Sequence, residues 1–296
     1  MTCVLLAGSP VAAGERSAGG KAPPAAALRQ LTEMRKRVGC TTAPIADFWQ
    51  DLTYRGRPAV EIWGRDSADP GGGKVYDFTV FDRAAGRIVA YVCHANVSKR
   101  QAGETIMSLG EISSIAERLA RQITPGFEPA LESILRFRAS GGESVYYEAR
   151  YALLQTEFPF FDPPVRLLFN ASTGSLFRLG IDADCLDPEA PPRATISHKE
   201  AEKIAASALR ASDLESVLGK GTTVRTIAAG EMYRVRPNGW LGFYTGDPQA
   251  RARVAWVVPF RTDGGDTPGT HSLFIDAATG RIIGGLARGT SGPMPR

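Results

Sequence analysis

Three stretches of the chain share one pattern of apolar and polar positions, at residues 81–89, 169–177 and 275–283. In each, an apolar residue precedes Asp or Asn, a glycine follows four positions later, and apolar residues then resume. Asp and Asn can hydrogen-bond to the nearby backbone, and glycine adopts positive φ without steric cost, so the pattern is typical of a β-hairpin turn. The residues predicted to form the turns are Asp82 and Gly86, Asn170 and Gly174, and Asp276 and Gly280.

Amphipathic helix patterns precede the second and third of these hairpins. Ser108 to Glu111 and Ser197 to Glu200 both have the Ser-x-x-Glu spacing of a capping box, which marks a helix start. Apolar residues then recur at intervals of three and four, as on the buried face of a helix. A weaker helix pattern begins at Pro24, in the first helical turn, where proline is well tolerated.

Strand-like runs lie between each helix pattern and its hairpin. We therefore predict an α+β fold of tandem repeats, each with one helix packed on a small antiparallel sheet. The predicted units are residues 23–98, 105–181 and 195–286, with a linker at 182–194, a leader at 1–22 and a flexible tail at 287–296.

The third unit resembles a PepSY domain. The resemblance rests on residues 196–205, a Ser-capped helix with alanines on its buried face, and on residues 274–283, which contain the closing Asp-x-x-Thr-Gly turn. Residues 105–180 match the pattern more loosely, and the first unit keeps only the turn. The resemblance implies a cystatin-like helix on a small antiparallel sheet, export from the cytoplasm, and a role in inhibiting or chaperoning a peptidase or in envelope sensing. The family has no agreed catalytic residues, so none are carried over.

Composition and charge exclude several classes of protein. The net charge is +4 and the basic residues are scattered, which does not favour a nucleic-acid partner. No stretch approaches the roughly 18–20 apolar residues that a membrane span requires. Residues 1–22 contain a short apolar run and a small-x-small sequence. They are interpreted either as the end of a truncated secretory signal or as a disordered leader. With the resemblance, they favour a secreted, periplasmic or cell-envelope protein.

Side chains that could carry chemistry are dispersed. His94, His198 and His271 show no metal-ligand spacing, and no catalytic, metal-binding or cofactor-binding residue is predicted. The acidic residues at 182–189 lack the spacing of a calcium loop and are interpreted as a solvated linker. Cys40 and Cys93 could form a disulfide, although buried free thiols are an equal alternative.

Two aromatic segments interrupted by Pro or Gly could contact a partner. Their candidate residues are Phe160, Phe161, Trp240, Phe243 and Tyr244. Exposed apolar patches often mark interaction sites, but the same residues could instead seal a joint between repeats. We predict an exported, non-enzymatic module that binds a protein or peptide and modulates or inhibits a peptidase. A cell-envelope scaffold or sensor is the alternative, and an uncharacterised hydrolase is a third.

Overall fold

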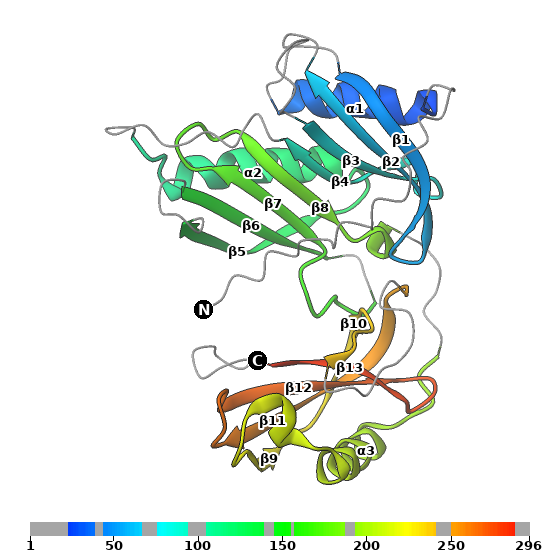
Figure 1. The fold of residues 1–296 in the computed structure, drawn as a ribbon, viewed down its shortest axis with the longest axis vertical. Coiled ribbons are helices and arrows are strands. Elements are labelled where there is room, and N and C mark those ends of the chain that lie inside the picture. Colours follow the sequence, from blue (N-terminus) through cyan, green and yellow to red (C-terminus); the bar gives the residue numbers. More distant parts are fainter. Residues whose placement is uncertain are drawn as a thin grey trace.

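The computed structural model describes residues 23–38, 44–66, 76–93, 105–138, 145–154, 157–186, 193–240 and 250–287. In this part of the chain, an eight-stranded and a five-stranded antiparallel sheet carry helices on their faces (Figure 1). The strands of the larger sheet are β1 (Pro44–Tyr54), β2 (Arg57–Asp66), β3 (Tyr76–Asp82), β4 (Arg87–Cys93), β5 (Pro129–Arg138), β6 (Val145–Leu153), β7 (Val165–Asn170) and β8 (Leu176–Ile181).

The larger sheet has the order β1-β2-β3-β4-β8-β7-β6-β5, so two four-stranded meanders meet at β4 and β8. Tyr91 pairs with Leu179 at this seam, antiparallel like the other pairs. Helices α1 (Ala25–Arg37) and α2 (Leu109–Ile123) bury their apolar residues in one shared core with both meanders. The Arg37 guanidinium donates to the Gln122 carbonyl oxygen at 3.2 Å, which links the ends of the two helices.

The start and the buried face of α2 follow from its sequence. The Ser108 side chain accepts from the Glu111 N–H, and the Glu111 carboxylate accepts from the Ser108 N–H, as in a capping box. Ile112, Ala116 and Leu119 lie on the buried face. Each fully buried Leu or Ile side chain contributes about 1.5–3 kcal/mol, so this face fixes the helix on the sheet.

The smaller sheet is organised around its long strand β11 (Arg253–Asp263). On one side β11 pairs with β12, and on the other it pairs with β10 along its first half and with β9 along its second half. Its other strands are β9 (Thr223–Ile227), β10 (Glu231–Val235), β12 (Gly269–Asp276) and β13 (Ile282–Ala287). Helix α3 (His198–Ala211), which begins with a second capping box, and the short helix α4 (Leu214–Leu218) pack against this sheet.

The three glycine turns have the same local geometry. Gly86, Gly174 and Gly280 lie between β3 and β4, β7 and β8, and β12 and β13, with φ of 63°, 66° and 68°. The side chain four residues earlier accepts from backbone N–H groups inside each turn. In each hairpin the register also shifts between the two residues that precede the Asp or Asn, which indicates a bulge next to the turn.

The predicted fold class is wrong. The described residues form 13 strands and four α-helices, and the first eight strands make one continuous sheet instead of two small sheets, each with its own helix. The physical reason is the seam, because β4 and β8 pair with each other instead of exposing their edges to solvent. The domain boundaries given above stay predictions. The leader at 1–22 and tail residues 288–296 lie outside the described residues, as do residues 187–192 of the linker.

Candidate functional site

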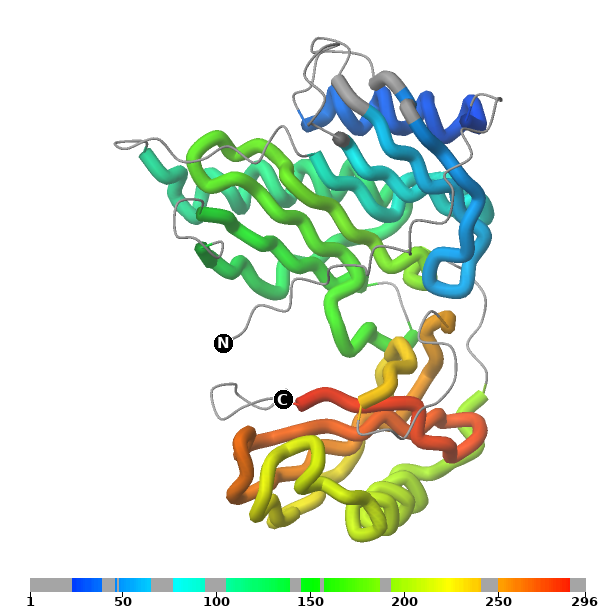
Figure 2. The backbone as a smooth tube through the Cα atoms, in the orientation of Figure 1, coloured from blue at the N-terminus to red at the C-terminus, as the bar shows by residue number. Residues whose placement is uncertain are grey.

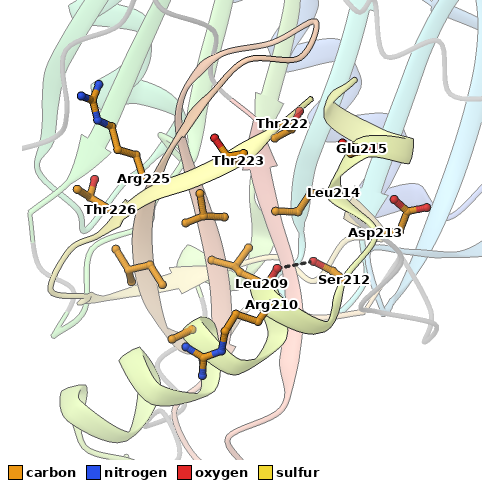
Figure 3. A pocket seen from close by; sticks show the side chains of 13 residues that line it. Leu209, Arg210, Ser212, Asp213, Leu214, Glu215, Thr222, Thr223, Arg225 and Thr226 are labelled. Carbon is orange, nitrogen blue, oxygen red and sulfur yellow. Dashed lines mark hydrogen bonds between the residues drawn. The ribbon is translucent and has the colours of Figure 1, made fainter. Parts of the chain in front are cut away.

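An open groove with a volume of about 640 Å³ lies at the edge of the five-stranded sheet (Figure 3). Its walls are the last turn of α3, the start of α4 and residues 222–227, which include all of β9. Successive residues of a strand point to opposite faces. Five consecutive residues lining one groove therefore place that groove along the edge of β9, where the main chain is accessible.

The outer edge of β9 carries no neighbouring strand in the described part of the chain, because β9 pairs with β11 alone. The Ala228 N–H donates to the Pro259 carbonyl oxygen at 2.9 Å. Since hydrogen-bonded and non-hydrogen-bonded pairs alternate in antiparallel sheets, the N–H and C=O of Ile227 point away from β11. Main-chain groups that could extend the sheet are therefore available along the groove.

The groove has an apolar floor. Leu209 and Leu214 are buried, at 4% and 7% exposure, and they pack in one cluster with half-buried Val224 and Ile227. These residues reach the floor from α3, α4 and β9, so three elements fix its shape. An apolar side chain entering from solvent would find contacts on several sides.

The groove lining carries charged side chains of both signs. Asp213 caps α4 by accepting from the Ser216 N–H at 3.3 Å, and Glu215 accepts from the Gly221 N–H at 3.0 Å. The two arginines of the lining, Arg210 and Arg225, are exposed. All four of these charged side chains are exposed, and Arg225 also pairs with Asp263 at 3.2 Å, so the lining carries two positive and two negative groups.

The polar side chains of the lining are Ser, Thr, Asp, Glu and Arg. The lining contains no histidine or cysteine, and the Ser212 hydroxyl donates to the Leu209 carbonyl oxygen at 3.3 Å. Nucleophilic catalysis requires a nucleophile within hydrogen-bond reach of a base, an arrangement that these lining residues do not make. An accessible strand edge beside apolar side chains is an arrangement that peptide-binding proteins use.

A second group of charged residues joins the two sheets, and we call it the junction cluster: Arg57, Asp182, Asp184, Arg236 and Arg251. Arg236 Nη2 lies 2.6 Å from Asp182 Oδ1 and 3.1 Å from Asp184 Oδ2. Arg251 Nε lies 3.1 Å from Asp184 Oδ1, and Arg57 Nη1 lies 3.5 Å from the same oxygen. Asp184 belongs to the short 3-10 helix η2 (Ala183–Leu186) after β8, whereas Arg236 and Arg251 flank β10 and β11. The cluster therefore connects the two sheets.

Burial affects the pKa values of two side chains in and beside the junction cluster, Asp182 and Cys185. Burial alone would raise the pKa of Asp182, but the guanidinium groups of Arg236 and Arg55 outweigh it and hold that pKa below its ordinary value. Burial likewise raises the pKa of the Cys185 thiol well above its ordinary value, so this thiol stays protonated and unreactive at neutral pH. The carboxylates of the junction cluster are paired with arginines, which gives the cluster a structural role.

The interpretation of the acidic residues as a solvated linker is wrong for Asp182 and Asp184. Their side chains are 13% and 4% exposed, and arginines from distant elements surround them. Asp187 and Glu189 lie outside the described residues. No local pattern of residues signals this burial, because the partner arginines lie about 50 to 130 residues away along the chain.

The predicted partner-binding residues fall in different places. Segment 157–164 extends from the larger sheet to β10 of the smaller one (Figure 2). There the Phe161 ring packs edge-on against Tyr233 and Phe274, with ring centroids 5.6 and 5.1 Å apart. The Arg234 guanidinium lies over the Phe160 ring at 5.8 Å. These contacts favour the interpretation of this segment as a seal, now between two sheets, and its role in partner binding stays a prediction.

The second aromatic segment is described only in part. Half-buried Trp240 packs against Phe260 and His271, with ring centroids 6.1 Å apart in both cases, while Phe243 and Tyr244 lie outside the described residues. Of the predicted partner-binding residues, the three that the structure describes, Phe160, Phe161 and Trp240, do not line the groove. The sequence analysis did not predict the groove. The groove is recognised by the unpaired edge of β9, and which strand edge stays unpaired depends on how distant strands pair.

The histidines and cysteines lie apart from the groove. His271 is buried beside the Thr262 hydroxyl at 2.8 Å, and the His198 ring lies near Trp256. Cys93 and Cys185 are buried; His94 and Cys40 lie outside the described residues, so the Cys40–Cys93 disulfide stays a prediction. Where the chain is described, no group of three or more His, Cys, Asp or Glu side chains is placed to hold a metal ion. No helix there is long and apolar enough to cross a membrane.

No protein-family model and no curated protein matches this chain. Among solved structures, the chain is similar to the Bacillus megaterium YpeB C-terminal domain, with a TM-score of 0.39 and 12% sequence identity over 88% of this chain and 96% of that one. At this identity and TM-score the likeness assigns neither fold nor function.

Proposed function

We propose that the chain is a non-enzymatic module that binds an extended segment of a protein or peptide by strand addition along the outer edge of β9. The observation that carries the proposal is the unpaired edge of β9 beside an open groove with an apolar floor. An exposed strand edge is a template for another chain, and main-chain hydrogen bonds then supply much of the affinity.

The dimensions of β9 set the length of the ligand. Five residues at about 3.3 Å each give an edge of roughly 16 Å, so five to seven residues of a bound segment would be in register. Alternate side chains of that segment would enter the groove and contact Leu209 and Leu214 on the floor. The remaining side chains would face solvent.

A finer proposal concerns the partner and the compartment. The capped helix at 196–205 and the turn at 274–283 support a PepSY-like module, and this resemblance supports an exported protein whose partner is a peptidase. The scaffold or sensor alternative stays a prediction, since no contact in the described residues favours it.

The test is selection from a random heptapeptide library displayed on phage, followed by synthesis of the enriched peptides with N-methyl groups at alternate main-chain nitrogens. Strand addition requires that methylation at one parity abolishes binding and that methylation at the other leaves it, because only alternate N–H groups face the protein. Backbone amide NMR signals of residues 223–227 should shift on binding. Failure to enrich any peptide, equal tolerance of both methylated series, or shifts confined to the larger sheet would each overturn the proposal.

A further inference from the structure

We propose that residues 236–240 form a strap that closes the outer edge of β13, and that protonation of His271 in mildly acidic solution releases it. In the described part of the chain β13 pairs with β12 alone, so it ends the smaller sheet. The proposal adds a pH-sensitive element to the fold and does not depend on strand addition at β9.

Asn238 occupies main-chain groups of the β13 edge. Its N–H donates to the Ile283 carbonyl oxygen at 2.9 Å. Its side-chain amide donates to the Gly285 carbonyl oxygen at 2.9 Å and accepts from the Gly285 N–H at 3.1 Å. Alternate residues of a strand direct their main-chain groups to the same neighbour, so Asn238 binds Ile283 and Gly285 as an adjacent strand would. One residue of the chain itself therefore closes this edge.

The two glycines of β13 make room for the strap. A Cβ atom on Gly284 would lie 2.5 Å from Asn238 Oδ1, and a Cβ atom on Gly285 would overlap the Trp240 ring. Both approaches are closer than nonbonded atoms tolerate. The strap and the two glycines thus fit each other, which supports a built contact at this edge.

Trp240 joins the strap to a buried histidine. Its ring stacks on the His271 ring with centroids 6.1 Å apart and lies at the same distance from Phe260. His271 is fully buried, whereas Trp240 is only half-buried. Release of the strap would therefore expose the His271 ring to water while β11, β12 and β13 stay paired.

Within the described residues, the groups around the His271 ring are uncharged. Its Nε2 lies 2.8 Å from the Thr262 hydroxyl oxygen, and its Nδ1 has no hydrogen-bond partner there. Phe260 and Trp240 contact the ring, and β13 contains no charged residue. The buried side chains of the two helices on this face of the sheet are apolar as well: Ala201, Ala205, Leu209, Leu214 and Leu218.

These surroundings make the charged ring unfavourable while the strap is closed. Burial lowers the pKa of His271 below its ordinary value of 6.5, and the Thr267 main chain, which favours the charged ring, offsets only part of this effect. A ring freed from the strap would be hydrated and would titrate near the ordinary value. Closure is therefore complete above pH 6.5 and is lost progressively as the pH falls toward the depressed pKa.

The other end of the strap does not titrate in this range. Arg236 Nη2 lies 2.6 Å from Asp182 Oδ1, and the pKa of Asp182 is below its ordinary value of 3.8. Asp182 therefore stays ionised between pH 7.5 and pH 5. A loss of closure over that interval would come from the His271 end.

Hydrogen exchange measured by NMR follows the strap at single amides. The Gly285 N–H donates to Asn238 and reports closure. The Ala277 N–H donates to the Val254 carbonyl oxygen at 3.0 Å and reports the sheet itself. From pH 7.5 to pH 5, the protection factor of Gly285, corrected for intrinsic exchange, should fall several-fold, while that of Ala277 should stay constant.

Three variants assign the effect. H271Q removes the titrating group and keeps an amide that can bond to Thr262, so Gly285 should stay protected at pH 5. H198Q is the matched control, since His198 is exposed at the start of α3, and it should respond to pH like the unmodified protein. N238A should lose the protection of Gly285 at both pH values.

The unmodified protein decides the proposal even if a variant fails to fold. A Gly285 protection factor that does not change between pH 7.5 and pH 5, or an equal loss at Ala277, would overturn it. A loss in folded H271Q as large as in H198Q would exclude His271 as the trigger. Retained protection of Gly285 in N238A would show that the strap does not close the edge.

Discussion

Replacing Asp184 with alanine should loosen the junction between the two sheets. The Asp184 side chain is 4% exposed and pairs with Arg236 Nη2 and Arg251 Nε, both at 3.1 Å. It also accepts from the Ala252 N–H at 2.7 Å. Alanine removes the acceptor from the Ala252 N–H and from Arg236, whose side chain is 21% exposed, while Arg251, at 41%, can turn to water.

The loss in free energy of unfolding depends on which ion-pair partners each arginine keeps in the variant. Removing one partner of a buried ion pair costs about 3–5 kcal/mol, because the other charge stays buried without compensation. Arg236 keeps Asp182 at 2.6 Å, and Arg57 keeps Asp82 at 2.6 Å. We therefore expect a loss near the lower limit, about 3 kcal/mol, which corresponds to a decrease in Tm of roughly 6–12 °C at 2–4 °C per kcal/mol.

Differential scanning calorimetry measures the decrease in Tm and shows whether the two sheets still unfold in one transition. Since Asp184 connects the sheets, the variant should also lose cooperativity, and one broad transition or two should replace a single transition. The control is Glu117→Gln on the surface of α2, whose pair with Arg121 at 2.9 Å is more than half exposed on both sides and contributes at most about 1 kcal/mol. A decrease in Tm for Asp184→Ala no larger than that of the control would refute a structural role for the junction cluster.

Two further predictions use pH and the glycine turns. Burial alone would raise the pKa of Asp182, but Arg236 holds it below its ordinary value of 3.8, so Asp182 stabilises the fold above that value and the stabilisation is lost as pH falls through the depressed pKa. Melts from pH 7 to pH 2 should show this acid loss in the unmodified protein and less of it in Asp182→Asn. At the turns, Gly86→Ala should cost about 1–2 kcal/mol in urea unfolding, because its φ is 63° but its Cβ would meet nothing within 4 Å. Gly174→Ala should cost more, since its Cβ would lie 2.7 Å from the Met107 sulfur, and equal losses would contradict this reasoning.

Local features of the fold could be predicted from the sequence. The capping box at Ser108 involves residues within one helical turn, and the turn at Gly280 involves five consecutive residues, so the chemistry that forms each of them is contained in a short window. The same holds for the apolar face of α2. These signals are strong because no distant residue is needed to produce them.

Features that depend on distant pairing could not be predicted. The seam between β4 and β8 joins residues about 90 positions apart, and nothing in either strand distinguishes an edge that pairs from an edge that stays exposed. Asp184 lies 52 residues from Arg236 and 127 from Arg57. A run of acidic residues without these partners is typical of a solvated linker, which is why that interpretation failed.

The groove and the seam are two outcomes of the same physical problem. A strand edge exposes unpaired N–H and C=O groups, and the chain can satisfy them internally or leave them for another molecule. In the larger sheet, β4 and β8 satisfy the N–H and C=O groups of each other's edges, so the two meanders become one sheet. In the smaller sheet, β10 and β9 share one side of β11, and the described residues place no strand outside β9. β1, β5 and β13 also end their sheets, but β9 borders the open groove, which is why we propose β9 as the edge with which an incoming chain would pair.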